Sequence, residues 1–293
     1  MVNGLRRALA VVAMVMLVFP LAAAPAGASS PAVDVLVYTG TEPGQWEHAS
    51  TSASVELLEM HGRRFGFSVT ATADPAVFTA DGLADYDVVL WVNNTGSTLD
   101  SAQRVAFEEW IGAGGGFVGV HAAARAEPDW PYFGRLVGAV PVTDETEPVT
   151  GQPITVNTGH PSTNDMPVEW NDFSDQWYRF DRDPAVGEQV SVLATIDVGD
   201  GERPLAWCQP FEGGRSWYTA LGHSADAYQN GEFMKMLRGG IWWAAGMTTP
   251  LLVQTHDAAP GWPYIVSFLA WIASIAIGGT LAVVRLNSRE ALI

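Results

Sequence analysis

Three of the six histidines in this 293-residue chain follow apolar segments that end in a turn. His121 ends the run GGGFVGVH, His223 follows RSWYTALG, and His48 lies in the loop after VDVLVYTG. An imidazole can exchange a proton near neutral pH, donate a hydrogen bond or bind a metal ion. Glycines before His121 and alanines after it predict a buried strand that places one side chain on a sharp strand-to-helix turn. These three histidines are therefore candidate catalytic residues.

Further titratable residues could complete such a site. His160, in the segment GHPST, is a fourth candidate, and Asp226 and Asp175 are candidate bases or orienting partners for an imidazole. Each histidine also has a structural alternative as a packed, hydrogen-bonded core residue. The sequence contains no H-x-x-x-H or C-x-x-C pair, so it assigns no metal ligands and no cofactor. A metal ion would need histidines that converge from separate strands.

The elements that must position these side chains alternate between strand and helix. Apolar runs predict strands over 33–40, 67–72, 86–96 and 115–121. Ser50 or Thr51 is expected to cap a helix that runs to about residue 64, and Asp100 or Ser101 to cap the next. In that second helix the expected buried side chains are Val105, Phe107, Trp110 and Ile111. The alternation predicts an α/β fold with a doubly wound, largely parallel sheet.

The second half of the chain is richer in strands. A hairpin is expected at Glu212-Gly213-Gly214, followed by a final helix over about 231–245. Ligands of open α/β sheets bind beyond the carboxyl ends of the strands. Residues that follow the strands are therefore candidates for substrate binding, namely Thr39, Gly40 and Asn94. Candidate rings for stacking on a sugar are Trp46, Trp130, Trp177 and Tyr178, for each of which core packing is the alternative.

Six segments occur in an order that resembles one known family, the ThuA-like (trehalose utilisation) domains. They are GGGFVGVHAAA, PDWPYFGRLVGA, HPST, DQWYRF, PLAWCQ and GGRSWYTALGHS. The resemblance covers roughly residues 33–246. It implies a flavodoxin-like sheet similar to class I glutamine amidotransferases, with His121 on the turn that carries the nucleophile in those enzymes. It also implies a role with trehalose and related glycosides, including 3-keto sugars.

The chain departs from the pattern expected of this family at several positions. Ala124-Arg125 stands where an Asp-Thr pair is common, and Gln176 where an acidic residue often precedes the Trp-Tyr pair. Arg203 replaces a common histidine, and Asp144-Glu145 stands near an expected His-Pro pair. Because Asp, Glu and His coordinate metals and move protons, these departures favour a member that binds without catalysing.

The two ends of the chain carry apolar segments. Residues 1–28 combine Arg6 and Arg7, an apolar run and a small-residue cleavage site after Ala28, which predicts a secretory signal, with an uncleaved anchor as the alternative. Residues 263–284 form a charge-free run followed by Arg285 and Arg289, which predicts one transmembrane helix with a cytoplasmic tail over 285–293. A ThuA-like domain over 29–247 would then face outward at the cell membrane, joined by a linker over 248–262.

Composition limits the partners. The formal net charge is −17 at pH 7, which disfavours nucleic acid. Cys208 is the only cysteine, so the chain has no internal disulfide. Two hypotheses follow from the sequence. One is a membrane-anchored domain that processes a small-molecule carbohydrate, as a hydrolase or lyase of glycosides or keto sugars. The other is a non-catalytic sugar-binding or protein-interaction module at the cell surface.

Overall fold

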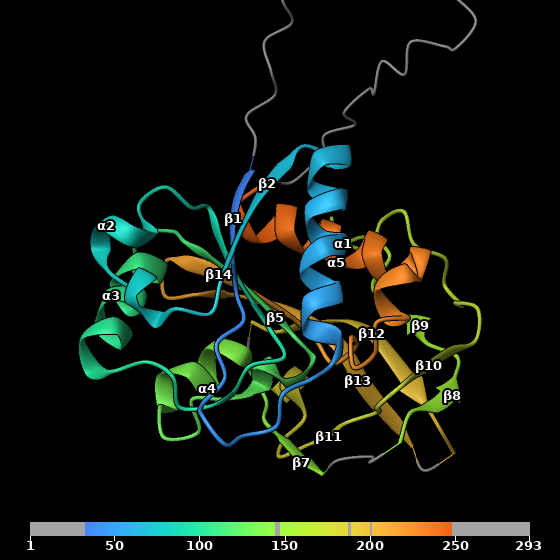
Figure 1. Ribbon diagram of the computed structural model, residues 1–293. Helices are drawn as coiled ribbons and strands as arrows, with labels where there is room; N and C mark the ends of the chain where they lie inside the picture. Colours follow the sequence, from blue (N-terminus) through green and yellow to red (C-terminus); the bar gives the residue numbers. More distant parts are fainter. Residues whose placement is uncertain (1–32, 144–146, 187–188, 200, 248–293) are drawn as a thin grey trace, which may run out of the picture.

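A computed structural model describes residues 33–143, 147–186, 189–199 and 201–247. Its centre is an eight-stranded sheet (Figure 1). The strands are β1 (Val33–Tyr38), β2 (Phe67–Thr72), β3 (Val88–Val92), β5 (Gly116–Val120), β9 (Ile154–Thr155), β12 (Ser191–Asp197), β13 (Glu202–Phe211) and β14 (Gly214–Thr219). They lie in the order β2-β1-β3-β5-β14-β13-β12-β9.

The sheet is parallel over its first five positions and antiparallel over the rest. Strands β2, β1, β3, β5 and β14 pair in parallel, whereas β13, β12 and β9 join through antiparallel pairs. The predicted α/β class, with a parallel core and a strand-rich second half, is confirmed. The expected hairpin is also confirmed, since Phe211 pairs with Gly214 around a tight turn.

Helices cover both faces of the sheet, with α1 and α5 on one face and α2, α3 and α4 on the other (Figure 1). Their bounds are α1 (Ser50–Phe65), α2 (Ala80–Leu83), α3 (Ser101–Gly112), α4 (Pro131–Val137) and α5 (Gly231–Ala244). Four 3-10 turns complete the helical elements: η1 (Pro75–Val77), η2 (His121–Ala124), η3 (Pro184–Val186) and η4 (Ala227–Gln229).

Three short two-stranded ladders lie outside the main sheet. They pair β4 (Thr95–Gly96) with β6 (Arg125–Ala126), β8 (Val149–Gly151) with β10 (Phe173–Asp175), and β7 (Pro141–Thr143) with β11 (Arg179–Phe180). The first two ladders matter for the site, because they hold the segments beside the carboxyl ends of β3, β5 and β14.

Helix α3 begins as predicted but buries fewer side chains than predicted. Asp100 accepts a hydrogen bond from the backbone N–H of Gln103 in a capping box. Phe107 and Ile111 are buried, but Val105 is 52% exposed and Trp110 only partly buried. The expectation for Val105 was wrong because residues two positions apart lie on different sides of a helix, and Phe107 takes the inner side.

The start of α1 also differs from the prediction. The residue before the helix is Ala49, which makes no side-chain cap, so neither Ser50 nor Thr51 caps α1. The Ser50 hydroxyl instead donates to the backbone carbonyl of His223, 2.8 Å away. The serine thus joins the start of α1 to the turn after β14.

The glycine run before β5 has a packing role. A Cβ atom built on Gly116 would lie 2.4 Å from the backbone oxygen of Ala244, so α5 can approach β5 only over a glycine. The last turn of α5 is therefore seated directly on the strand that leads to His121.

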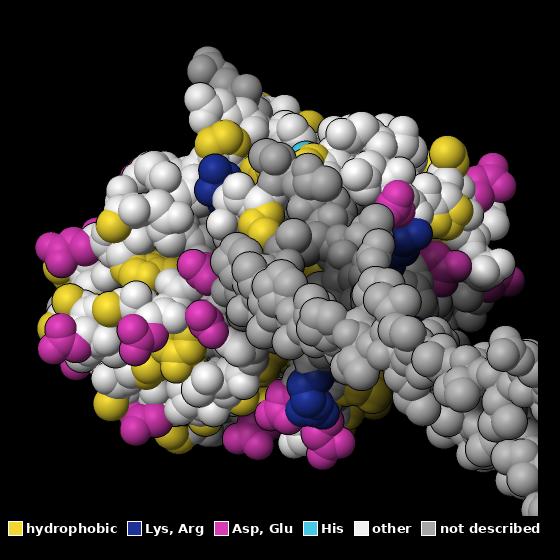
Figure 2. All heavy atoms as spheres, turned by 90° about the horizontal axis from the view of Figure 1, so that it is seen from above, with side chains coloured by type: hydrophobic (Ala, Val, Ile, Leu, Met, Phe, Trp, Pro, Cys, Tyr) yellow, Lys and Arg dark blue, Asp and Glu magenta, His cyan; other side chains and the backbone are white. Residues whose placement is uncertain are grey.

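The surface is predominantly acidic. In the view of Figure 2, Asp and Glu side chains outnumber Lys and Arg on the visible face, in keeping with the net charge of −17. Within the described ranges, no helix is long and apolar enough to cross a membrane. The expected signal (1–28), linker (248–262), transmembrane helix (263–284) and tail (285–293) lie outside the described residues.

Candidate functional site

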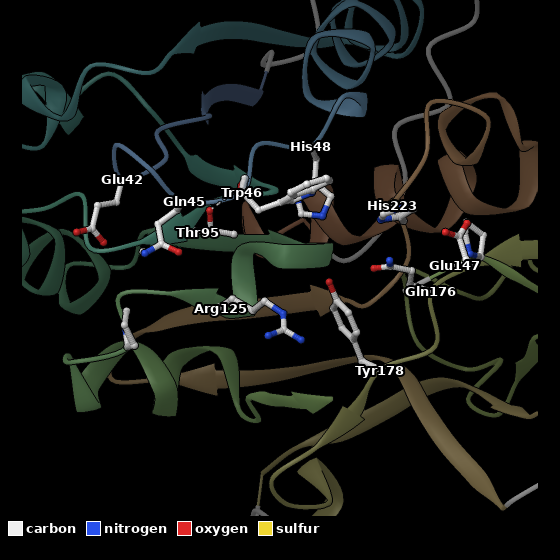
Figure 3. Close-up of a pocket in the computed structure, with 13 residues that line it drawn as sticks. Glu42, Gln45, Trp46, His48, Thr95, Arg125, Glu147, Gln176, Tyr178 and His223 are labelled. Carbon is white, nitrogen blue, oxygen red and sulfur yellow. Dashed lines mark hydrogen bonds between the residues drawn. The ribbon is translucent and has the colours of Figure 1, made fainter. Parts of the chain in front are cut away.

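A pocket of about 790 Å³ opens beside the carboxyl ends of the parallel strands (Figure 3). Polar, charged and aromatic side chains line it together. The lining residues are Glu42, Gln45, Trp46, His48, Thr95, Gly96, Arg125, Pro128, Glu147, Pro148, Gln176, Tyr178 and His223. The volume is in the usual range for small-molecule sites.

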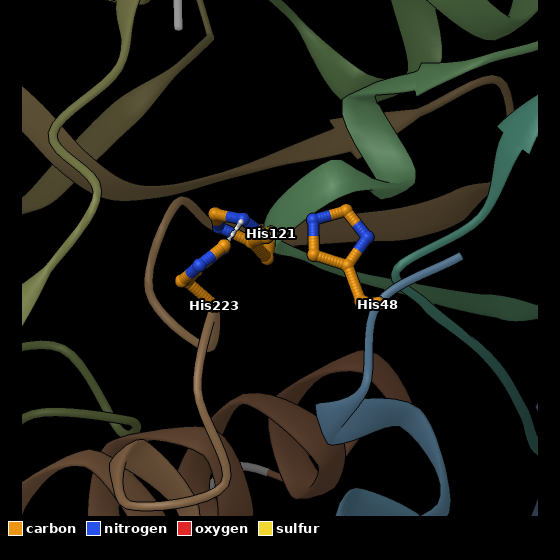
Figure 4. Close-up of side chains that lie close together, drawn as sticks. All are labelled: His48, His121 and His223. Carbon is orange, nitrogen blue, oxygen red and sulfur yellow. Dashed lines mark hydrogen bonds between the residues drawn. The ribbon is translucent and has the colours of Figure 1, made fainter. Parts of the chain in front are cut away.

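Three histidines meet at this pocket (Figure 4). His48 comes from the loop before α1, His121 from the end of β5 and His223 from the turn after β14. One ring nitrogen from each lies within 4.8 Å of the other two. The ring centroid of His48 lies 5.1 Å from the ring centroid of His121 and 5.5 Å from that of His223. The structure thus brings three of the candidate site residues together, from three separate segments of the chain.

His121 occupies the predicted sharp turn. Its φ angle is +53°, an unusual backbone conformation for a residue other than glycine, and its side chain is fully buried. Its Nδ1 lies 2.8 Å from the backbone carbonyl of Ala220, which can only accept, so we assign the proton to Nδ1. The lone pair of Nε2 therefore faces the Tyr178 hydroxyl at 2.9 Å and the Nδ1 atom of His223 at 3.3 Å.

His121 is not itself among the pocket-lining residues. It lies beneath them, with its ring stacked on that of Tyr178 at a centroid distance of 4.7 Å. The groups that face the pocket directly are His48, His223 and Tyr178. His121 consequently reaches a ligand through Tyr178 and His223.

The buried carboxylate of Asp175 holds the turn that carries His223. It accepts hydrogen bonds from the backbone N–H groups of Gly222 and His223, and also from that of Gln176. Burial raises the pKa of Asp175 to about 7, although these three donors act in the opposite direction. Among the described residues this carboxylate accepts from backbone N–H groups and contacts no imidazole, so its role here is to position the backbone.

Burial favours the neutral form of all three imidazoles. Burial, followed by the charges of His223 and Arg125, lowers the pKa of His48 to about 4. Burial and the neighbouring His48 set the pKa of His121 well below its ordinary range, and burial also lowers that of His223. Neutral imidazoles keep a lone pair, with which they can accept a proton or bind a metal ion.

The ring of His48 contacts those of His121 and His223, but in the described part of the chain a hydrogen bond is missing at one of its nitrogens. Its Nδ1 atom is buried without a hydrogen-bond partner among the described residues, which costs free energy that a core position would avoid. Trp46, two residues earlier, is 72% exposed at the pocket, unlike the other tryptophans singled out from the sequence. Together these two side chains indicate a segment arranged for a ligand.

Several predicted site residues lie away from the pocket. Thr39 pairs with Thr72 across β1 and β2, and the Asn94 amide donates to the carbonyls of Tyr38 and Gly40. These residues fix the backbone near the site and do not line the pocket. The polar side chains after β1 and β3 thus satisfy neighbouring peptide groups.

Two of the four predicted stacking rings are core residues. Trp130 is 7% exposed and donates to Glu108, and Trp177 is 1% exposed, so the packing alternative describes both. Asp226 is exposed and lies outside the pocket lining, at the start of η4. Of the predicted aromatic residues, Trp46 and Tyr178 alone line the pocket.

His160 also lies apart from the three converging histidines. Its Nδ1 pairs with the Ser162 hydroxyl at 2.8 Å and its Nε2 with the Cys208 sulfur at 3.3 Å. Both ring nitrogens are therefore used in packing contacts, which supports the structural alternative for this histidine.

His160 is expected to make stability depend on pH. Burial lowers its pKa to about 4, whereas an unfolded histidine titrates near 6.5. Between these values the unfolded chain binds a proton that the folded chain refuses, so His160 lowers the free energy of unfolding as the pH falls from 6.5 to 4. We expect the free energy of unfolding of His160→Gln, measured by urea unfolding, to fall less steeply with decreasing pH over this range than that of the parent. The difference in slope should be at most that produced by the uptake of one proton. Parallel curves of the free energy of unfolding against pH for the two proteins would contradict the lowered pKa of His160.

Sequence reasoning missed most of the polar pocket. Glu42, Gln45, Thr95 and Glu147 carry no local signal. Arg125 and Gln176 were noted only as departures from the family pattern, and both line the pocket. The guanidinium carbon of Arg125 lies 5.2 Å from the centre of the Tyr178 ring. Positions at which a chain departs from its family were therefore a usable signal for this pocket.

Comparisons with known proteins agree on the fold. A ThuA-like protein from Bacteroides uniformis is 25% identical, with a TM-score of 0.60 over 76% of this chain and 95% of its own. One from Parabacteroides merdae is 23% identical, with a TM-score of 0.62 over 74% and 92%. A cytoplasmic protein from Salmonella typhimurium is 13% identical, with a TM-score of 0.54 over 72% and 99%, and is similar in fold alone.

No curated protein matches this chain. The family model for trehalose utilisation, ThuA, matches residues 34–244. That match spans all but the first residue of the described sheet, the five helices of the described part of the chain and the histidine pocket. The chain therefore belongs to the ThuA family.

Proposed function

We propose that the pocket binds a carbohydrate, a trehalose-like glycoside or a keto-sugar derivative, and that the chain acts on it there. The observation that carries the proposal is the meeting of His48, His223 and Tyr178 at one pocket, above the buried His121. Titratable groups with perturbed pKa values that converge in a pocket are typical of functional sites. Family membership supports a role related to carbohydrate utilisation.

The chemistry that suits these groups is proton transfer. His121 Nε2 can accept the Tyr178 proton across 2.9 Å, so that the phenol oxygen can take a proton from a ligand. His223, on the pocket wall, can donate or accept at a second ligand atom. Abstraction of a proton beside a keto group and cleavage of a glycosidic bond both need such a pair.

The pocket also offers recognition of a polyol. The exposed ring of Trp46 can cover the apolar face of a pyranose. Glu42, Arg125 and Gln176 supply charged and polar groups suited to sugar hydroxyls or a carbonyl. Their mixture of donors and acceptors favours a neutral, oxygen-rich ligand over an apolar one.

The location of the domain is part of this proposal. The apolar segments at both ends of the sequence support secretion, with a single transmembrane helix that tethers the domain outside the cytoplasm. The acidic surface argues against nucleic acid as a partner. Fractionation of cells, with protease added from outside, tests this location directly.

A thermal-shift screen of the full chain against glycosides and their 3-keto derivatives tests the proposed ligand. We expect a concentration-dependent rise in the unfolding temperature with at least one of them, because a ligand that binds only the folded state stabilises it. A positive compound is then incubated with the chain and its products are analysed. The absence of any shift across both compound classes would overturn the proposal.

A second candidate is a sugar-binding module without catalysis. The observation that favours it is that Arg125 and Gln176 line the pocket at positions where the family pattern has other residues. A thermal shift without conversion of the compound, together with affinity that survives His121→Ala, would select this function.

Trp46→Ala is expected to weaken carbohydrate binding about tenfold and to leave stability almost unchanged. The ring is exposed, so its removal takes away little packing in the folded state but most of the apolar platform for a ligand. Calorimetric titration with the positive compound measures the affinity, and urea unfolding the stability. Unchanged affinity would show that the ligand does not stack on this ring.

A further inference from the structure

The three converging histidines resemble a ligand set more than a hydrogen-bonded network. The Nε2 atom of His121 has one lone pair, yet it faces both the Tyr178 hydroxyl at 2.9 Å and Nδ1 of His223 at 3.3 Å. One ring nitrogen of His48 points toward the same place (Figure 4). A positive centre among the rings would accept the lone pairs of all three.

We propose that His48, His121 and His223 bind one divalent transition-metal ion, most favourably zinc. Neutral imidazoles suit zinc, and three protein ligands with an open fourth position are the arrangement of catalytic zinc sites. Whether a metal ion binds does not depend on the proposed carbohydrate ligand. A bound ion would occupy the Nε2 lone pair of His121, so the transfer of the Tyr178 proton to His121 belongs to the metal-free chain. The role of the open position rests on the proposed function, since a sugar hydroxyl or carbonyl oxygen is the ligand that would bind there.

The spacing of the nitrogens supports the site. Two imidazole nitrogens on one tetrahedral zinc ion, each about 2.0–2.1 Å from it, lie roughly 3.3 Å apart. The His121 and His223 nitrogens are 3.3 Å apart, and the whole set lies within 4.8 Å. His48 must approach by a small movement, and it lies in a loop before α1 with no hydrogen bond at Nδ1 among the described residues to oppose this.

The hydrogen-bond partners of His121 and His223 are of the kind that hold metal ligands in place. A metal-bound histidine usually donates its other N–H to a carbonyl or carboxylate, which fixes the ring. Nδ1 of His121 donates to the carbonyl of Ala220 at 2.8 Å. The backbone of His223 is fixed twice, through its N–H to Asp175 and through its carbonyl to Ser50. Two of the three proposed ligands are thus held in place before a metal arrives.

The nearby charges act in opposite directions. Arg125 opposes positive charge at His48 and His121, whereas Glu147 favours it at His223. An ion between the rings would therefore have Glu147 as a counter-charge on one side of the pocket. On the other side, Arg125 could bind the same oxygen-rich ligand as the ion. This placement suits polarisation of a carbonyl or hydroxyl oxygen.

Metal binding is tested on the full chain without a histidine tag, first treated with chelator and then titrated with Co²⁺ and Zn²⁺. Visible d–d absorption reports Co²⁺ at a site with nitrogen ligands, and competition by Zn²⁺ gives the zinc affinity. We expect saturation at one equivalent. His48→Ala and His223→Ala should each weaken binding at least about tenfold, because even partners behind the ligands are worth that much.

Controls separate this outcome from misfolding and from the proposed function. His61→Ala, a histidine of α1 outside the cluster, should leave metal affinity unchanged. Binding that does not saturate at one equivalent, or that the His48 and His223 variants leave unaltered, would overturn the site. A sugar-induced thermal shift in the presence of chelator, without metal binding, would reject the metal and keep the proposed function. Metal binding without any sugar-induced thermal shift would keep the metal site and reject the proposed function.

Discussion

Replacing His121 with alanine is expected to lower turnover of the carbohydrate at least about a hundredfold, the lower end of what acid–base groups contribute. The imidazole is placed to receive the Tyr178 proton, at 2.9 Å, and it also lies 3.3 Å from His223. Its removal takes away the hydrogen bond from the Tyr178 hydroxyl and the hydrogen bond to the Ala220 carbonyl. Product formation from the compound found by thermal shift measures the effect.

Two companion variants separate chemistry from structure in this prediction. Tyr178→Phe removes only the hydroxyl and keeps the stacked ring, so it should lose turnover to a similar extent while unfolding like the parent. The double variant should lose little more than either single one, since both break the same hydrogen bond. His61→Ala is the matched control. Independent, additive losses would show that the two residues do not act as a pair.

Glu127→Ala is expected to lower the free energy of unfolding by about 3 kcal/mol, the lower end of the cost of removing one partner of a buried ion pair, because the Arg104 side chain that remains is 22% exposed. Glu127 is 1% exposed, with a φ angle of +53°, and it forms a two-pronged contact with Arg104 at 2.6 and 3.0 Å. Its other oxygen accepts from the backbone N–H groups of Thr98 and Leu99. The substitution leaves all of these donors unpaired beside β4 and β6.

The control for this prediction is an exposed ion pair. Glu59 and Arg63 lie 3.7 Å apart on the surface of α1, with side chains 43% and 71% exposed. Glu59→Ala should change the free energy of unfolding by less than about 1 kcal/mol. Urea unfolding of both variants gives the comparison. Equal, small effects would mean that the Glu127 network contributes little to holding the loops beside the pocket.

Much of the architecture could be predicted because it depends on local patterns. Apolar runs of strand length, separated by amphipathic helices, give the parallel sheet. The glycine-rich segment before His121 gave the sharp turn, which the left-handed φ of that residue confirms. The carboxyl ends of parallel strands lie at one edge of the sheet. Because His48, His121 and His223 follow β1, β5 and β14 in the sequence, they are brought to that same edge.

The side-chain directions at that edge could not be predicted. Asn94 follows β3 as His121 follows β5, yet its amide turns inward to the carbonyls of Tyr38 and Gly40. Tyr178 and Trp177 are neighbours, yet the first lines the pocket and the second is core. Which neighbour faces the pocket depends on the register of short segments such as β10 and β11, and that register is set by non-local pairing.

The proposed metal ligands form no local sequence motif for the same reason. Local motifs detect zinc ligands spaced a helical turn or a short loop apart. His121 lies 73 positions after His48 and 102 positions before His223. The three histidines therefore meet only when β1, β5 and β14 are assembled. The tautomer of His121 depends on the Ala220 carbonyl, 99 positions away. Contacts of this kind appear only in the folded structure.

The central claim is that the histidine pocket is where this chain binds its carbohydrate. The most direct measurement is ¹⁵N NMR of the full chain labelled only at histidine. The ring signals of its six histidines, two nitrogens each, are assigned with single variants and followed as a glycoside or keto sugar is added. We predict that the signals of His48, His121 and His223 move together and saturate, while those of His61 and His160 stay in place. Binding that shifts none of these three signals would contradict the account.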